Sequence, residues 1–306
     1  MNGVARLPMK NTANWVNPGL RSVLFKEINT DSWIHSHRGT SLYKASITNQ
    51  TEMARIFITG SADGLGLLAA KELVSKGHRV VLHARNEDRA NAVFKKIPEA
   101  EKVLVGDLAS MKETINLAVQ VNGFGSFDAV IHNAGVYQIP ANARSENGLP
   151  LTFAVNSLAP YILTALVHRP KRLIYLSSNM HMYGNASLNR LDEIPRGRNI
   201  PSYSDTKLHD LILALSVARK WPEVVSNAVD PGWVPTKMGG SSAPDDLNKG
   251  FATQVWLAAD EDEKAKISGR YLYHKREMDC NPQAKEIEIQ EKFLSICEQI
   301  SGIPLV

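Results

Sequence analysis

Short apolar runs alternate with helical patterns along the chain from residue 54 to its end. The runs lie at 55–59, 79–83, 102–105, 128–132, 172–176, 224–229 and 270–273, and the helical patterns at 64–77, 87–97, 110–122, 151–168, 202–221, 248–260 and 283–300. Such alternation predicts an α/β fold, a doubly wound parallel sheet of about seven strands with helices on both faces. No internal repeat or clear linker interrupts it, so 54–306 is predicted to be a single domain.

The N-terminal part of the chain, 1–53, differs from the rest. It is rich in Asn, Ser and Thr, shows no sustained period, and holds six Lys or Arg against three acidic residues. We expect a poorly ordered extension. An organelle-targeting peptide is an alternative, because the segment is basic and contains Ser and Thr. Its acidic residues argue against that alternative. A third alternative is that translation starts at Met53, just before the first predicted strand.

Charge and composition exclude several classes of function. Residues 54–306 carry 29 basic and 28 acidic side chains, a near balance that offers no nucleic-acid-binding surface. The longest apolar stretches, such as 211–215, fall far short of the ~20 residues that a membrane helix needs. Cys280 and Cys297 are too few for a disulfide framework and have no neighbouring Cys or His at metal-ligand spacing. We therefore expect a cytoplasmic protein with no membrane span and no metal site.

A glycine-rich turn follows the first predicted strand and opens the first predicted helix, with the spacing Gly-x-x-x-Gly-x-Gly. Glycines at such a turn let the backbone approach a pyrophosphate, which binds the free N–H groups of the helix N-terminus. The turn therefore predicts a Rossmann-like dinucleotide site. Its candidate binding residues are Thr59, Gly60, Asp63, Gly64, Leu65 and Gly66. A glycine-rich turn without a ligand is the alternative.

The ends of the next strands indicate which dinucleotide binds. The second strand ends without an acid but with Arg85, and an arginine there suits the 2′-phosphate of NADP(H). We therefore favour NADP(H) over NAD(H), although Asp63 is an anion near that phosphate, and Arg85 could instead be a solvated loop residue. Further candidates for cofactor binding are Asp107 and Leu108 after the third strand, and Asn133, Ala134 and Gly135 after the fourth.

Tyr203 and Lys207 are four residues apart at the start of an apolar helical run. Residues at that spacing share a helix face. We expect the ammonium to lower the pKa of the phenol, so that the tyrosine can exchange a proton with a substrate oxygen near neutral pH. Ser177 and Ser178 end the fifth strand, where strand C-termini face the ligand crevice. Asn156 is an isolated polar residue in an apolar helical pattern.

Together these motifs resemble the short-chain dehydrogenase/reductase family of the non-extended type, over residue 54 to about 275. The matching elements, in the family order, are Thr59-Gly60-x-x-x-Gly64-x-Gly66, Asn133-Ala134-Gly135, Asn156, Ser177-Ser178, Tyr203-x-x-x-Lys207 and Pro231-Gly232. The resemblance implies a catalytic tetrad of Asn156, Ser178, Tyr203 and Lys207. It also implies that Pro231, Gly232, Val234 and Thr236 belong to the cofactor site, with Thr236 on the nicotinamide side.

The resemblance further implies a mechanism. Ser178 would orient a carbonyl oxygen, Tyr203 would give or take the proton, and Lys207 would lower the tyrosine pKa and bind ribose hydroxyls. Asn156 would hold a water that links Lys207 to solvent. The expected activity is NADP(H)-dependent hydride transfer between nicotinamide and a carbonyl or alcohol. A non-catalytic nucleotide-sensing regulator and an epimerase-type relative are the alternatives, although an epimerase would normally show Gly-x-x-Gly-x-x-Gly, which is absent here.

Substrate selectivity is predicted in the loops 136–150, 179–200 and 233–246, at the strand C-termini. Their large apolar side chains predict a roomy pocket for an apolar small molecule; these are Met180, Met182, Tyr183, Trp233 and Met238. The helix 202–221 is apolar almost all round, which indicates cover on two sides. That favours a homodimer, although Arg169-Pro170 shortens the helix that often forms the family's dimer face.

Overall fold

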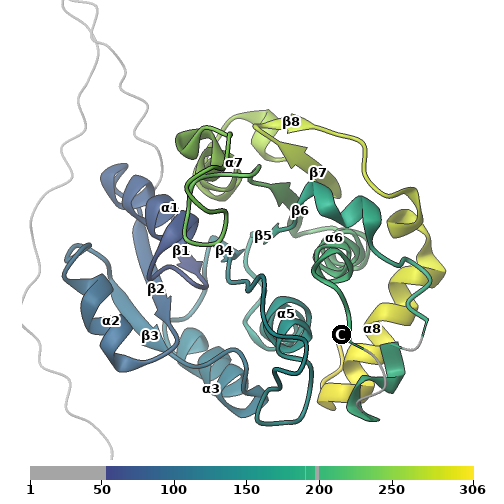
Figure 1. Ribbon diagram of the computed structural model, residues 1–306. Helices are drawn as coiled ribbons and strands as arrows, with labels where there is room; N and C mark the ends of the chain where they lie inside the picture. Colours follow the sequence, from purple (N-terminus) through teal and green to yellow (C-terminus); the bar gives the residue numbers. More distant parts are fainter. Residues whose placement is uncertain (1–52, 190, 197–199) are drawn as a thin grey trace, which may run out of the picture. The chain divides into compact units, whose positions relative to one another are not determined.

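The computed structural model describes residues 53–189, 191–196 and 200–306. Within these residues one sheet holds eight strands in the order β3-β2-β1-β4-β5-β6-β7-β8 (Figure 1). The strands are β1 (Arg55–Ile58), β2 (Arg79–Ala84), β3 (Lys102–Val105), β4 (Ala129–His132), β5 (Arg172–Leu176), β6 (Val225–Asp230), β7 (Arg270–Tyr273) and β8 (Arg276–Glu277). All neighbours pair in parallel except β7 and β8. The predicted doubly wound sheet is confirmed.

The sheet reverses its order at β1, which pairs with β2 on one side and β4 on the other. Ile58 lies beside Leu82 of β2 and beside Ile131 of β4. The connections that follow β1 and β4 run to opposite faces of the sheet. A crevice therefore opens beyond the carboxyl ends of these two strands. The eighth strand was not predicted, because its two residues are charged and exposed and form no apolar run.

Helices cover both faces of the sheet (Figure 1). One apolar cluster packs α1 (Gly64–Ser75), α2 (Glu87–Phe94) and α7 (Leu247–Ala259) on one face. The other cluster packs α3 (Met111–Asn122), α4 (Leu151–Phe153), α5 (Ala159–Leu166), α6 (Tyr203–Lys220) and α8 (Ile287–Ser301) on the opposite face. Alternate residues of β1 divide between the two clusters, as Ile56 and Phe57 do, because side chains of a strand alternate in direction.

The predicted helix over 151–168 is divided into three parts. The short α4 leads into a π-helical turn, Ala154–Leu158, and α5 then runs to Leu166. The helix ends before Arg169-Pro170, as expected. Asn156 lies in the middle of the π turn, which explains how an amide is placed inside an apolar helix. Such turns often occur at functional sites.

Helix α6 is buried on almost every side. It begins with a capping box in which Ser202 and Asp205 each accept the other's backbone N–H. One side packs on β5 and β6, and α8 covers another, where the Phe293 ring stacks 4.9 Å from the His209 ring. The apolar pattern that favoured a homodimer is thus accounted for by α8 of the same chain. The homodimer stays a prediction without that support.

Some predictions lie outside the described residues. The extension 1–53 falls there except for Met53, which is exposed. Among the described residues no helix is long and apolar enough to cross a membrane, and no cluster of three or more His, Cys, Asp or Glu could hold a metal ion. The described residues fall within one compact unit, Asn49–Val306.

Replacing Phe293 with alanine should destabilise the fold strongly, because this ring is fully buried between α8 and α6. We expect Phe293→Ala to lower the free energy of unfolding by about 3–5 kcal/mol, as for other buried aromatic residues. Ile287→Ala, at a position 57% exposed on the same helix, is the control and should have almost no effect. Urea unfolding measures both, and equal effects would show that α8 does not cover α6.

Candidate active site

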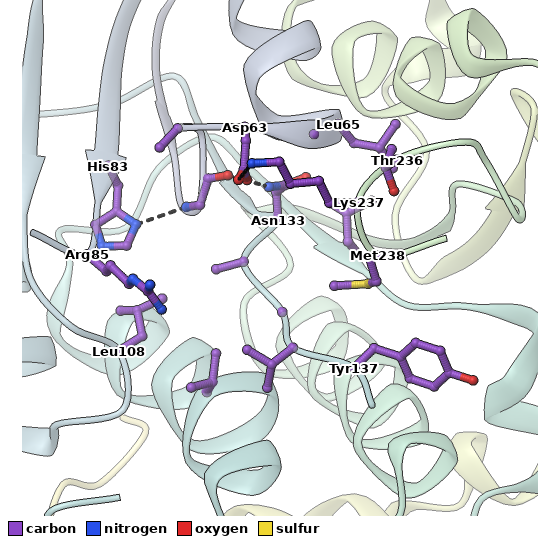
Figure 2. A pocket seen from close by; sticks show the side chains of 18 of the residues that line it. Asp63, Leu65, His83, Arg85, Leu108, Asn133, Tyr137, Thr236, Lys237 and Met238 are labelled. Atoms are coloured by element: carbon purple, nitrogen blue, oxygen red, sulfur yellow. Dashed lines mark hydrogen bonds and ion pairs between the residues drawn. The ribbon is translucent and has the colours of Figure 1, made fainter. Parts of the chain in front are cut away.

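A cavity of about 550 Å³ lies at the carboxyl ends of the strands, where the crevice was expected (Figure 2). Its wall is built from the segments that follow β1 to β6, together with α6. The predicted site residues that line it are Gly60, Asp63, Gly64, Leu65, Arg85, Asp107, Leu108, Asn133, Ala134, Gly135, Tyr203, Lys207, Pro231 and Thr236. Residues from distant parts of the sequence therefore meet around one space.

The glycine turn fits this wall closely. Gly60 has φ +63°, and a Cβ there would lie 2.8 Å from the Cα of Ala134. A Cβ on Gly66 would lie 2.4 Å from Nδ2 of Asn133, which donates to the carbonyl oxygens of Thr59 and Gly60. The turn and the strand end beside it therefore approach more closely than larger residues allow.

Four predicted cofactor residues, Thr59, Gly66, Gly232 and Val234, do not line this cavity. Oγ1 of Thr59 accepts the backbone N–H groups of Asn133 and Ala134 at 3.0 and 3.1 Å. Val234 is buried, and Gly232, at φ +79°, lines a second cavity. The contacts of Thr59 and the packing of Gly66 support the shape of the turn.

His83 ties three strand ends together at the cavity. Its Nδ1 accepts the N–H of Gly60 at 2.9 Å (Figure 2). Its Nε2 lies 2.8 Å from the carbonyl oxygen of Gly106. Burial lowers its pKa to about 4, so the ring is neutral and can accept at one nitrogen and donate at the other. Sequence reasoning missed this role, although a histidine inside a buried strand was its signal.

Basic side chains gather near the end of β2. Nη2 of Arg89 lies 2.6 Å from Oδ2 of Asp63, and Nζ of Lys237 lies 3.8 Å from the same oxygen. Arg85 is exposed, lines the cavity, and has no ion-pair partner among the described residues. The anion of the glycine turn is therefore paired, and Arg85 remains available to a ligand. The pairing of Asp63 was not foreseen, because Arg89 lies 26 positions away in sequence.

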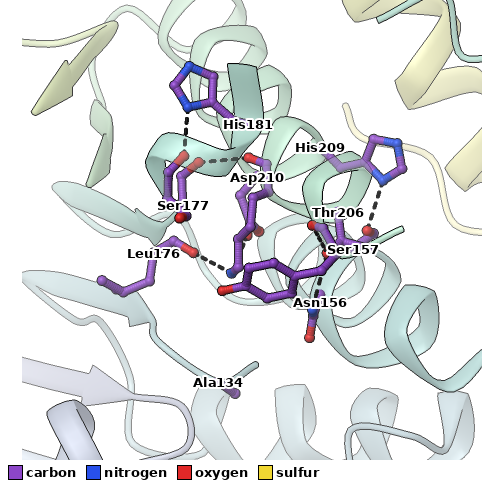
Figure 3. A network of polar contacts seen from close by, with 12 residues as sticks. Ala134, Asn156, Ser157, Leu176, Ser177, His181, Thr206, His209 and Asp210 are labelled. Atoms are coloured by element: carbon purple, nitrogen blue, oxygen red, sulfur yellow. Dashed lines mark hydrogen bonds and ion pairs between the residues drawn. The ribbon is translucent and has the colours of Figure 1, made fainter. Parts of the chain in front are cut away.

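The ammonium of Lys207 is buried at the floor of the site. Its Nζ donates to the carbonyl oxygen of Leu176 at 2.6 Å and to Oδ2 of Asp210 at 2.9 Å (Figure 3). Burial lowers the pKa of Lys207, but Asp210 and Tyr203 raise it, and the net shift is upward. The lysine is therefore charged at neutral pH. Asp210 was missed, because it stands within an otherwise apolar helical run.

Tyr203 opens α6 and lines the cavity above Lys207. The lysine Nζ lies 5.6 Å from the centre of its ring, and the ring of Tyr137 lies 4.6 Å away. The predicted lowering of its pKa is wrong for this structure. Burial raises the pKa of the phenol, and the opposing effect of Lys207 is smaller. The prediction counted the neighbouring charge and left out the loss of water around the phenol.

Asn156 joins the π turn to two other segments. Its Oδ1 accepts the N–H of Val136 at 2.8 Å, and its Nδ2 donates to the carbonyl oxygen of Val136 and to Oγ1 of Thr206 at 3.0 and 3.1 Å. Both amide hydrogens are therefore used within the protein. The predicted water between Asn156 and Lys207 stays a prediction.

The two serines after β5 have different environments. Ser177 is buried, and its Oγ donates to the carbonyl oxygen of Lys207 at 2.7 Å (Figure 3). Ser178 is partly exposed, its Oγ accepts the N–H of Met180 at 3.2 Å, and Nδ1 of His181 lies 2.6 Å from its carbonyl oxygen. Ser177 lines the first cavity and Asn179 the second. Ser178 itself lines neither cavity, and its contact with substrate stays a prediction.

A second cavity, of about 470 Å³, lies beside the first. Gly232 lines it, next to Pro231 in the first cavity. Its large side chains are mainly apolar or aromatic; they are Met182, Trp233, Tyr271, Tyr273 and Met278. Of the residues predicted to form a substrate pocket, Met182 and Trp233 lie here and Met238 lies in the first cavity, whereas Met180 and Tyr183 line neither.

Comparisons with known proteins indicate the family to which this chain is related. The family model described as short chain dehydrogenase matches residues 54–189. An oxidoreductase of Emericella nidulans is 44% identical over 256 residues, which cover 82% of this chain and 98% of that protein. A short-chain dehydrogenase of Gibberella zeae is 40% identical over 83% of this chain and 99% of its own length. Human retinol dehydrogenase 14 is 26% identical over 81% of this chain and 86% of its own.

Solved structures show the same fold. A protein from Mycobacterium paratuberculosis superposes with a TM-score of 0.69 at 22% identity and covers 83% of this chain and 95% of its own. A gluconate 5-dehydrogenase from Burkholderia cenocepacia, solved with NADP and tartrate, gives 0.56 at 18% identity over 72% and 92%.

Fold and relatives together define an oxidoreductase with a nicotinamide cofactor, acting on CH–OH or C=O groups. The chain belongs to the short-chain dehydrogenase family.

Lowering the pH should destabilise the protein through His83. Its folded pKa of about 4 lies below the ordinary value of about 6.5, so unfolding takes up a proton between these values. This stability is fully present above about pH 6.5 and is lost as the pH falls toward 4. Between about pH 7 and 5, wild type should lose about 2 kcal/mol more unfolding free energy than His83→Gln. Urea unfolding at both pH values measures this, and equal losses would contradict it.

Proposed function

We propose that the protein is an NADP(H)-dependent oxidoreductase in which Tyr203 exchanges the substrate proton while hydride passes between nicotinamide and a carbonyl or alcohol carbon. The observation that carries the proposal is the position of the Lys207 ammonium. Two of its three hydrogens are held by Leu176 and Asp210. The third is left for a ligand in the cavity that Tyr203 and Lys207 both line.

The cavity suits a dinucleotide along its whole length. Gly135 lies beside the lysine: a Cβ there would be in ordinary van der Waals contact, 3.7 Å from Nζ of Lys207 and 3.6 Å from Oδ1 of Asn156. The glycine turn and the N-terminus of α1 would receive the pyrophosphate. Bound there, the cofactor supplies the hydride or accepts it. Ser178 would hydrogen-bond the substrate oxygen and Tyr203 would hold the proton that this oxygen gains or loses.

The preference for NADP(H) is supported by charge at the end of β2. Arg85 is exposed there and has no ion-pair partner within the part of the chain that the structure describes, whereas Asp63 is already paired with Arg89. Ala84 ends the strand where an NAD site usually has an acid. A solved relative of the same fold was crystallised with NADP.

We further propose that the substrate is apolar and reaches Ser178 and Tyr203 from the second cavity. The aromatic and methionine side chains of that cavity would pack on such a molecule. A relative named for retinol is in keeping with an apolar alcohol or aldehyde.

An assay of NADPH oxidation with a panel of aldehydes, ketones and quinones tests the activity. We expect turnover that favours apolar carbonyls. Tight NADPH binding without turnover on any member would point instead to a nucleotide-sensing regulator. Rearrangement of a sugar nucleotide without net NADPH oxidation would point to an epimerase.

Removing the hydroxyl of Tyr203 should slow the reaction strongly and leave cofactor binding unchanged. We expect Tyr203→Phe to slow turnover by about 10²–10⁴-fold, the range for loss of a general acid. The Kd for NADPH, measured by fluorescence titration, should stay unchanged. Tyr183→Phe makes the same substitution at a side chain that is 84% exposed and lines neither cavity, and it should retain turnover. Turnover preserved in Tyr203→Phe would refute the assignment.

Reversing the charge of Arg85 should weaken NADPH binding selectively. We expect Arg85→Asp to raise the KM for NADPH by about 10-fold or more, while the KM for NADH stays within about twofold. Arg276→Asp, an exposed residue of β8 that lines neither cavity, is the control. Steady-state kinetics with both cofactors measures the effect. Equal changes in the two KM values would contradict the proposed preference for NADP(H).

A further inference from the structure

Asp210 lies one turn after Lys207 on α6, and its carboxylate is aimed at the lysine. Oδ2 of Asp210 lies 2.9 Å from Nζ of Lys207. The two residues are only 3% and 5% exposed. Asp210 does not line the cofactor cavity, so it acts on the site through Lys207. The ammonium of Lys207 connects Asp210 with the carbonyl oxygen of Leu176, at the end of β5 (Figure 3).

The charges that face Tyr203 come from three parts of the fold. Lys207 and Asp210 belong to α6, Tyr137 to the loop after β4, and Asp230 to the end of β6. Lys207 favours the ionised phenol, and the other three oppose it. Asp210 is the only one of these three that contacts the ammonium directly, so it has the greatest control over the charge beside the phenol.

We propose that Asp210 is a positioning residue for the reaction: it holds the Lys207 ammonium in place and offsets part of the positive charge that Lys207 presents to Tyr203. The role in turnover rests on the proposed function, whereas the effect on Tyr203 can be measured without any substrate. Burial raises the pKa of Asp210 to about 6, so the carboxylate is ionised at neutral pH and can offset the lysine charge.

A neutral residue at this position should change how Tyr203 ionises. The ammonium would keep the carbonyl oxygen of Leu176 as an acceptor, and the local charge would rise by about one unit. Positive charge at this range in a partly desolvated site favours a phenolate. Tyr203 should therefore ionise at a pH about one unit lower.

The experiment is an ultraviolet difference titration of phenol ionisation. Wild type is compared with Tyr203→Phe, and Asp210→Asn with the double variant Asp210→Asn/Tyr203→Phe, so that each difference isolates Tyr203. We expect the transition of Tyr203 to move to lower pH in Asp210→Asn. Asp210→Ser is a second neutral variant and should shift it in the same direction. Circular dichroism at each pH confirms that the variants compared are folded.

Asp205→Asn is the matched control. It removes the same charge from the same helix, but its carboxylate caps the helix N-terminus and is partly exposed. It does not contact Lys207, and the transition of Tyr203 should stay in place. A shift as large as that of Asp210→Asn would show that any charge on α6 has this effect, and would overturn the proposal.

A folded Asp210→Asn or Asp210→Ser whose Tyr203 titrates at the wild-type pH, or at a higher one, would also overturn it. In alcohol oxidation, where Tyr203 is the base, the rise of kcat/KM with pH should move to lower pH together with the titration. If the titration of Tyr203 moves but the pH profile of kcat/KM does not, the role of Asp210 in the reaction is refuted. Absence of turnover in wild type would instead refute the proposed function, and the titration would still decide the placement of Asp210.

Discussion

The buried ammonium of Lys207 is the interaction on which the rest of the site depends. Taking a charge out of water costs several kcal/mol unless close partners compensate for it. Here Leu176 supplies a carbonyl oxygen from the end of β5, and Asp210 supplies a carboxylate from the next turn of α6. Ser177 adds a second link by donating to the carbonyl oxygen of Lys207. The register of α6 against β5 is therefore fixed by hydrogen bonds as well as by apolar packing.

That register determines where Tyr203 lies, because Tyr203 is the first residue of α6, one turn before Lys207. Thr206, on the intervening turn, accepts from Asn156 of the π turn, and Asn156 in turn holds Val136 at both backbone groups. The loop after β4, the π turn and α6 thus meet around one amide. The first cavity and Tyr203 are therefore positioned by the same small set of buried polar contacts.

The sequence was sufficient for the sheet and for about half of the residues that line the first cavity, since strand alternation and the glycine turn follow local rules. It was not sufficient where burial competes with charge. The pKa of Tyr203 was predicted in the wrong direction, because the burial of a phenol depends on the folded chain and not on a spacing. Asp210 and His83 were overlooked for a related reason. A polar residue within an apolar run reveals its partners only when the elements around it are packed.

A crystal structure with NADP⁺ bound would show whether the buried ammonium of Lys207 holds the cofactor. We expect Lys207 to keep its hydrogen bonds to Leu176 and Asp210 and to donate its remaining hydrogen to the ribose, with the 2′-phosphate beside Arg85. An ammonium that leaves Asp210 when the cofactor binds, or a ribose that does not touch Lys207, would contradict it.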